Sequence, residues 1–196
     1  GKALAEGDMS PWNPIGFKYS GYSCEGYAYT YPHQNGQILY AALLALIAGE
    51  NTAFLWQILN VAFLAAGMYY TGMLAKEVLP LRRRYGLTLF LSAFLPFSFY
   101  FTFAYSTVPG FACSAAALWY QRCFLRGGGR KNLLLSALSI AAAILLKSNY
   151  LIVVTAMVIF FAADAVFKRR AASLLGAVLA VSFYVISHSA VLFGLS

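Results

Sequence analysis

Residues 53–84 read AFLWQILNVAFLAAGMYYTGMLAKEVLPLRRR, a long apolar run followed by a proline and three arginines. The apolar part, residues 53–78, is longer than the roughly 20 residues that a helix needs to cross the hydrocarbon core of a membrane. Arginines directly after such a run are typical of the cytoplasmic flank of a spanning helix. The stretch therefore predicts a transmembrane helix that ends in a basic loop.

The same pattern of apolar run and polar separator continues to the end of the chain. We expect further spans at about 85–105, 110–126, 132–147, 150–167 and 171–194. The predicted fold class is therefore all-α, a polytopic transmembrane helical bundle of about six spans. Separators rich in Lys and Arg alternate with separators that are not, as expected for a chain that crosses a membrane repeatedly.

Composition excludes a soluble globule and argues against a nucleic-acid partner. Hydrophobic residues make up 61% of the 196 residues and charged residues only 10%, too few for a polar shell. The formal net charge is +8, but Lys and Arg occur in short runs between apolar stretches instead of on one polar face. Three cysteines without a C-x-x-C pair predict neither a disulfide framework nor a zinc site.

The distribution of Lys and Arg predicts the orientation in the cell membrane. With the basic loops on one side, that side holds eleven cations: Lys76, Arg82, Arg83, Arg84, Arg122, Arg126, Arg130, Lys131, Lys168, Arg169 and Arg170. The other side keeps Lys2, Lys18 and Lys147. The positive-inside rule then places the eleven in the cytoplasm and residues 1–52 outside.

Three segments are expected along the chain. Residues 1–36 form an outer loop rich in Tyr, Gly and Pro, and its aromatic side chains suit either a membrane-surface belt or a platform for carbohydrate. Residues 37–49 form a juxtamembrane helix with Gly36 and Gly49 as its ends, since some 20 Å of helix is too short to span. The alternative is that this helix does span, which would put residues 1–36 in the cytoplasm. Residues 53–196 form the transmembrane bundle.

Three stretches in this order carry a family resemblance. Residues 29–40 read YTYPHQNGQILY, residues 42–49 read ALLALIAG and residues 56–61 read WQILNV. They resemble the Tyr-Pro-x-Gln element, the short apolar helix and the opening of the next span in bacterial family 39 glycosyltransferases. These are GT-C enzymes related to protein O-mannosyltransferases and to the lipid A aminoarabinose transferase. AEGDMSP at residues 5–11 and LKSNYLI at residues 146–152 match further family elements.

The resemblance implies an enzyme that moves a sugar from a polyprenyl-phosphate carrier to an acceptor on the outer face of the membrane. Its expected partners are the polyprenyl-phosphate-linked sugar and membrane lipid, with no nucleic acid and no cofactor. The family's catalytic Asp would lie before Gly1, so we expect this chain to be an inactive piece of a longer enzyme. A second acidic position of the family corresponds to Thr107, and Glu25 is the local stand-in for a general base.

The candidate substrate-binding residues are Lys147, Tyr31, His33, Gln34 and Asn35. Lys147 falls at the outer end of its predicted span, and it either snorkels to the interface as an anchor or contacts the donor phosphate. The other four lie in the family element and are expected to contact the sugar. For His33 alone, a polar cap of the loop is the alternative.

The remaining polar residues predict structure more than chemistry. No Asp-x-Asp, H-E-x-x-H or G-x-x-x-x-G-K motif occurs, so the sequence predicts no metal site and no nucleotide-dependent chemistry. Asp164 precedes Lys168 by four residues, the spacing of an ion pair on one helix face.

The alternative to a transferase is a non-enzymatic multi-pass membrane protein, such as a transporter or scaffold. A transporter would need polar, broken helices repeated in two halves, and no such repeat occurs.

Overall fold

The computed structural model describes residues 6–7, 17–19, 22–24, 35–93 and 106–168, with isolated residues between 173 and 185. Regular structure in this part of the chain is helical apart from one pair of short strands, so the predicted helical class is confirmed here. The helices are α3 (Asn35–Ala48), α4 (Thr52–Val78), α5 (Leu81–Ala93), α7 (Thr107–Leu125), α8 (Arg130–Leu146) and α9 (Leu151–Lys168). Two 3₁₀ turns, η3 (Gly49–Asn51) and η4 (Ser148–Tyr150), lead into α4 and α9.

Among the described residues, two helical segments are long and apolar enough to cross a membrane, judged by length and composition. They are Gly36–Val78 and Ser148–Lys168, and they contain the predicted spans 53–78 and 150–167. Within the first segment, α4 has 27 residues and is about 40 Å long, which exceeds the roughly 30 Å of a hydrocarbon core. Helices α7 and α8 form at the predicted spans 110–126 and 132–147. Helix α5 covers the start of 85–105, while the rest of that span and most of 171–194 lie outside the described residues.

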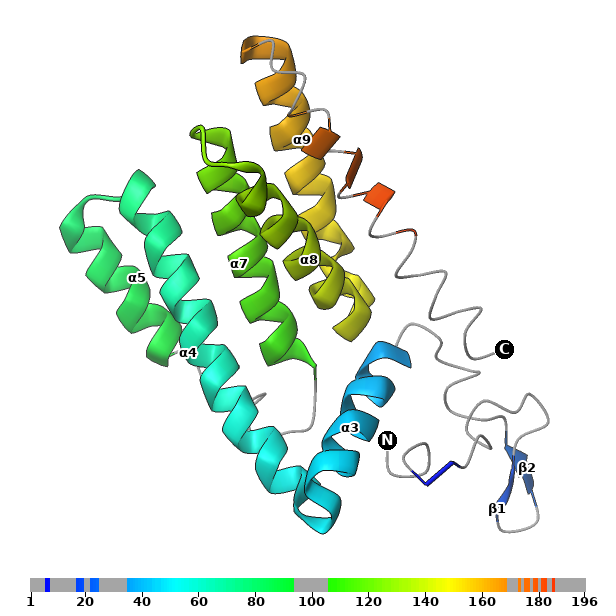
Figure 1. Ribbon diagram of the computed structural model, residues 1–196. Helices are drawn as coiled ribbons and strands as arrows, with labels where there is room; N and C mark the ends of the chain where they lie inside the picture. Colours follow the sequence, from blue (N-terminus) through cyan, green and yellow to red (C-terminus); the bar gives the residue numbers. More distant parts are fainter. Residues whose placement is uncertain are drawn as a thin grey trace.

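The helices run alternately up and down beside one another. In Figure 1, α4, α7 and α9 run in one direction, whereas α5 and α8 run in the other. Helix α7 lies in the middle, between α4 on one side and α8 and α9 on the other. The short turns between α4 and α5 and between α7 and α8 therefore lie at one end of the molecule, and the turn between α8 and α9 lies at the opposite end.

Small residues allow α7 to occupy this central position. Its buried side includes Gly110, Ala112, Ser114 and the run Ala115–Ala117. Helices in lipid associate through such small side chains, because close backbone approach replaces a hydrophobic driving force that lipid cannot provide. Where α7 and α8 meet, the Ser136 hydroxyl donates a buried hydrogen bond of 2.8 Å to the carbonyl oxygen of Ala117.

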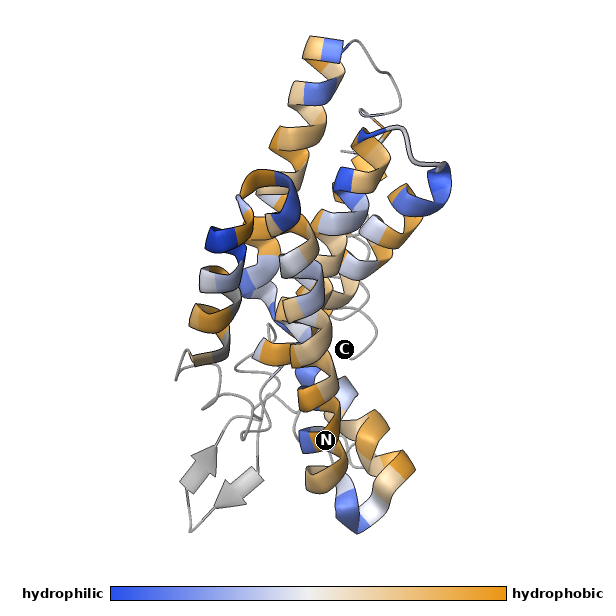
Figure 2. Ribbon diagram, turned by 90° about the vertical axis from the view of Figure 1, so that its left-hand side faces the viewer, coloured by the Kyte–Doolittle hydropathy of each residue, from blue (hydrophilic) through white to orange (hydrophobic). Residues whose placement is uncertain are grey.

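The outer surface of the helices is apolar, as expected for a bundle that faces lipid. Figure 2 shows hydrophobic residues along the helices and hydrophilic residues gathered near their ends. Large exposed side chains include Leu43, Ile47, Phe54, Tyr69, Leu89, Ile152, Ile159, Phe160 and Phe167. An apolar surface of this extent marks contact with a membrane or with other protein surfaces.

Helix α3 is separate from α4 and folds back beside its first turns (Figure 1). The break lies at Gly49, whose φ of 55° belongs to the left-handed region that glycine adopts without strain. The expected ends of this helix, Gly36 and Gly49, agree with α3 (Asn35–Ala48) to within one residue. Gly36, in the first turn of α3, also packs closely against the backbone of Leu145 in α8. The position of α3 relative to a membrane stays a prediction.

The outer segment 1–36 was expected to be a loop throughout, and a short hairpin corrects this. Strand β1 (Phe17–Tyr19) pairs antiparallel with β2 (Tyr22–Cys24), with Lys18 opposite Ser23. Both strands alternate a large or apolar residue with a polar one, which is the pattern typical of a strand. This alternation was visible in the sequence, but three residues per strand are too few to predict a hairpin from it.

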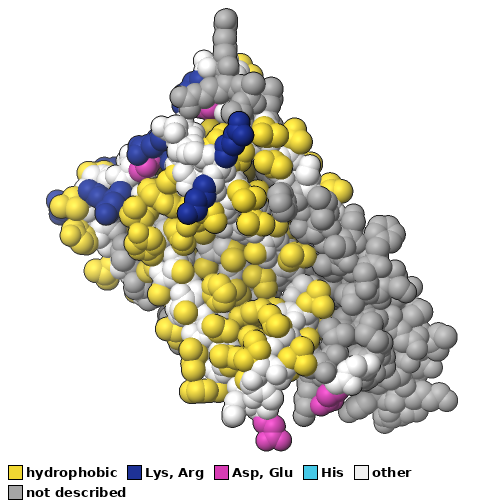
Figure 3. Space-filling view, viewed as in Figure 1, with side chains coloured by type: hydrophobic (Ala, Val, Ile, Leu, Met, Phe, Trp, Pro, Cys, Tyr) yellow, Lys and Arg dark blue, Asp and Glu magenta, His cyan; other side chains and the backbone are white. Residues whose placement is uncertain are grey.

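Basic side chains gather at the end of the molecule where α4, α7 and α9 finish. Lys76 lies in the last turn of α4, Arg122 in the last turn of α7 and Lys168 at the end of α9. Figure 3 shows Lys and Arg concentrated toward this end of the visible face. The predicted pair is confirmed here, since Lys168 Nζ lies 2.8 Å from Asp164 Oδ1. Asp164 also accepts a 2.6 Å hydrogen bond from Ser173. We call this end the basic end.

Candidate functional site

Three helix termini meet at the end opposite the basic end, and they form the candidate site. The first turn of α3, the start of α7 and the α8–α9 corner converge on Ser106. Its hydroxyl donates to the carbonyl oxygen of Leu146 over 2.5 Å, and Gln37 Oε1 lies 3.2 Å from the same hydroxyl. Ser106 is buried, so these contacts hold the three termini together away from solvent.

Lys147 reaches this junction from the end of α8. The helix ends at Leu146, and Lys147 adopts an extended backbone while its amide still donates to the carbonyl oxygen of Ala143 over 3.0 Å. The extended conformation turns the side chain toward α7, where Nζ donates a 3.0 Å hydrogen bond to Thr107 Oγ1. The ammonium group is therefore held at a defined position between two helix termini.

Tyr150 fixes the same threonine from the other side of the corner. The 3₁₀ turn Ser148–Tyr150 carries its ring back toward α7, and the phenol donates a 2.6 Å hydrogen bond to the carbonyl oxygen of Thr107. Thr107 thus accepts bonds from both Lys147 and Tyr150, one through its side chain and one through its backbone. We call Ser106, Thr107, Lys147 and Tyr150 the corner cluster.

The corner cluster holds a cation beside neutral partners. In the ranges that the structure describes, no carboxylate forms an ion pair with Lys147. The Thr107 hydroxyl orients the ammonium group of Lys147 but does not neutralise its charge. Lys147 is half-buried, so its charge is screened less than it would be in bulk water. An ammonium group retains three donors, so bonding to Thr107 leaves it able to bind an anion such as a phosphate oxygen.

The structure places two of the sequence-predicted site residues near this junction. Lys147 is at its centre, and Asn35 begins α3 directly before Gly36, which packs on Leu145. Tyr31, His33, Gln34 and the stand-in base Glu25 lie outside the described residues. Within the described part of the chain, no group of three or more His, Cys, Asp or Glu side chains is placed to hold a metal ion.

Sequence reasoning missed Ser106, Tyr150 and Gln37 as parts of the site. Thr107 was noted only because it occupies the position at which family 39 glycosyltransferases have an acidic residue, and no contact with Lys147 was predicted. Its pairing with Lys147 joins positions 40 residues apart, and helical periodicity relates only near neighbours. One feature of the sequence could have indicated this pairing. Ser106-Thr107 and residues 147–150 both lie at the end of a predicted span, and both ends are predicted to lie on the same side of the membrane.

Comparisons of this chain with protein-family models, with curated proteins and with solved structures find no match.

Proposed function

We propose that this chain is part of a multi-pass membrane protein with about six spans, oriented with its basic end in the cytoplasm and its corner cluster outside. Support comes from the alternating helix directions and from the basic residues of α4, α7 and α9 at a single end. The positive-inside rule relates that end to the cytoplasm. Residues 1–52, which lead into α4 from the opposite end, then lie outside.

The activity that we propose is transfer of a sugar from a polyprenyl-phosphate carrier to an acceptor on the outer face. The observation that carries it is the position of Lys147, an ammonium group oriented by the neutral Thr107 hydroxyl at an outer helix junction. A lipid-linked phosphate in the outer leaflet meets the protein at this depth, and a compact cation is suited to a phosphate oxygen. The resemblance of residues 29–40 and 146–152 to family 39 glycosyltransferases points to the same reaction.

In the proposed reaction, the bond between the sugar's anomeric carbon and the phosphate oxygen breaks as the acceptor oxygen or nitrogen bonds to that carbon. The bonding electron pair leaves with the polyprenyl phosphate, and negative charge grows on its oxygens. Lys147 stabilises that charge, while Thr107 and Tyr150 position Lys147. A carboxylate base removes the acceptor proton; the family resemblance assigns this role to an Asp, and Glu25 is the stand-in within this sequence. Tyr31, His33, Gln34 and Asn35 would contact the sugar.

The test is sugar transfer by the full-length protein that contains this sequence, reconstituted in liposomes with defined polyprenyl-phosphate sugars. We expect release of polyprenyl phosphate to depend on an acceptor and to fall in a Lys147→Met variant. Lys131→Met is the matched control, because Lys131 is an exposed lysine at the opposite end of the same helix. Absence of transfer from every polyprenyl-phosphate donor, by a protein that is folded, would favour the non-enzymatic alternative.

A further inference from the structure

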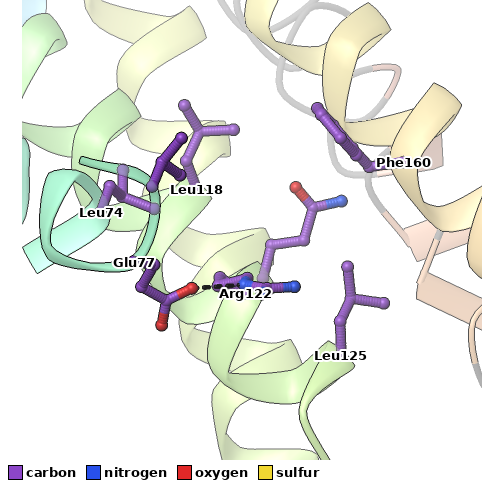
Figure 4. Close-up of a pocket in the computed structure, with 8 residues that line it drawn as sticks. Leu74, Glu77, Leu118, Arg122, Leu125 and Phe160 are labelled. Atoms are coloured by element: carbon purple, nitrogen blue, oxygen red, sulfur yellow. Dashed lines mark hydrogen bonds and ion pairs between the residues drawn. The ribbon is translucent and has the colours of Figure 1, made fainter. Parts of the chain in front are cut away.

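A second polar cluster lies at the basic end, beside a cavity that the proposed sugar transfer does not use. The cavity has a volume of about 320 Å³ and lies between α4, α7 and α9. Most of its wall is apolar, and Glu77, Gln121 and Arg122 supply the polar part; its lining residues are Leu74, Glu77, Val78, Leu118, Gln121, Arg122, Leu125 and Phe160. Figure 4 shows Glu77 turned toward Arg122 on one side, with Phe160 on the helix opposite.

The polar side of the cavity carries excess positive charge. Glu77 Oε2 lies 2.5 Å from Arg122 Nε, and Glu77 Oε1 lies 2.6 Å from Arg126 Nη1. Two guanidinium groups thus share one carboxylate, whose side chain is only 10% exposed. Each guanidinium has five N–H donors in a planar fork, so it can bind Glu77 and a phosphate oxygen at the same time. Arg122 lines the cavity, and Arg126 lies next to it because both bind the same carboxylate. One carboxylate leaves this pair of arginines with a net positive charge.

The apolar side of the cavity opens toward a surface that faces lipid. Val78 is 80% exposed and Phe160 is 60% exposed, and both line the cavity and belong to the apolar outer surface of α4 and α9. A free phosphate ion gains nothing from such walls. A molecule with an anionic head and a hydrocarbon tail satisfies both parts, because its tail can occupy the apolar groove while its head meets the arginines.

We propose that this cavity binds an anionic phospholipid of the inner leaflet. The phosphodiester lies against Arg122 and Arg126, and an acyl chain follows the groove between α4 and α9. The proposal rests on the membrane orientation proposed above but not on sugar transfer. Only charge and position are required of the arginines, so a protein without transferase activity would bind the same lipid.

The experiment is lipid binding by the full-length protein, measured by native mass spectrometry with phosphatidylglycerol and, separately, phosphatidylcholine. The double variant Arg122→Gln, Arg126→Gln should bind phosphatidylglycerol roughly tenfold or more weakly, as expected for lost charge-assisted bonds. Arg130→Gln is the matched control, since Arg130 is exposed at the same end but, in the described part of the chain, neither lines the cavity nor pairs with Glu77. It should bind like the unaltered protein, and phosphatidylcholine binding should change in neither of these two variants.

A second variant tests the groove without altering any charged residue. Its result therefore does not depend on whether the double variant, which removes both partners of Glu77, still folds. Leu74→Trp fills the groove and leaves Glu77 and both arginines in place, so it too should weaken phosphatidylglycerol binding. Equal losses in Arg130→Gln and the double variant would overturn the proposal, because binding would then follow total charge. Unchanged binding in Leu74→Trp would overturn it as well, and so would displacement of phosphatidylglycerol by inorganic phosphate.

Discussion

Replacing Lys147 by methionine should weaken binding of the donor phosphate strongly and change thermal stability little. Methionine keeps the apolar stem of the side chain and removes its cation, so the substitution isolates the charge. A hydrogen bond to a charged group contributes about 1.5–3 kcal/mol, which corresponds to roughly a tenfold to hundredfold loss of affinity. We therefore expect the dissociation constant for polyprenyl phosphate to rise within that range.

The small effect on stability follows from the surroundings of Lys147. Its 3.0 Å bond to Thr107 Oγ1 is only partly buried, and the threonine hydroxyl can turn to another partner when the ammonium group is lost. Such a bond contributes about 1 kcal/mol or less to folding. The Ser106 and Tyr150 contacts, which join the same helix termini, remain intact.

The assay titrates polyprenyl phosphate into the full-length protein in lipid nanodiscs and records thermal unfolding of the same preparation. Thr107→Val is a useful companion, because it retains the charge and removes the hydroxyl that orients it; a smaller loss of affinity is expected. Normal donor binding by Lys147→Met, or a large fall in unfolding temperature with affinity unchanged, would refute the phosphate role. Lys147 would then be an interfacial anchor.

Two further predictions concern packing and charge. Gly36→Ala should destabilise the protein, because an added Cβ would collide with the carbonyl of Leu145, whereas Gly72→Ala in α4 meets no neighbour within 4 Å and should be neutral or stabilising by up to about 1 kcal/mol. Similar unfolding temperatures for the two variants would refute the close α3–α8 contact. Asp164→Asn should lower stability by about 1–3 kcal/mol, since the buried side chain loses its charge toward Lys168 and Ser173, and should leave donor binding unchanged. A change in donor affinity would show that Asp164 is more than structural.

Local patterns in the sequence predicted the parts of the fold that depend on near neighbours. Residues 53–78 form α4 (Thr52–Val78) almost as expected. A long apolar run predicts such a helix because the run itself is what favours a helix that crosses a membrane. Asp164 and Lys168 pair as their spacing of four predicts. Lys147 was predicted as the last residue of its span, and α8 ends one residue earlier, because polar residues interrupt the apolar run there.

Contacts between distant segments could not be predicted in the same way. The bond between Lys147 and Thr107 and the bridge from Glu77 to Arg122 and Arg126 depend on how α4, α7 and α8 pack, which periodicity within one helix does not specify. Gly36 lies in the first turn of α3, as composition predicted, but its close contact with the backbone of Leu145 depends on how α3 and α8 pack and was not predicted. Sequence reasoning thus singled out Lys147 but not the hydroxyl of Thr107 that it contacts or the phenol of Tyr150 beside it.

The most direct test of the central claim, that the corner cluster faces the outside and the basic end faces the cytoplasm, is labelling of single cysteines by an impermeant thiol reagent in intact spheroplasts. Asn149 and Glu50 are exposed at the predicted outer end, and Gly129 is exposed at the basic end, whereas Ser106 is buried and unsuitable. With the three native cysteines replaced by alanine, Asn149→Cys and Glu50→Cys should label, and Gly129→Cys should label only after the membrane is permeabilised. Labelling of Gly129→Cys in intact spheroplasts, with Asn149→Cys protected, would contradict the orientation and the outer site that depends on it.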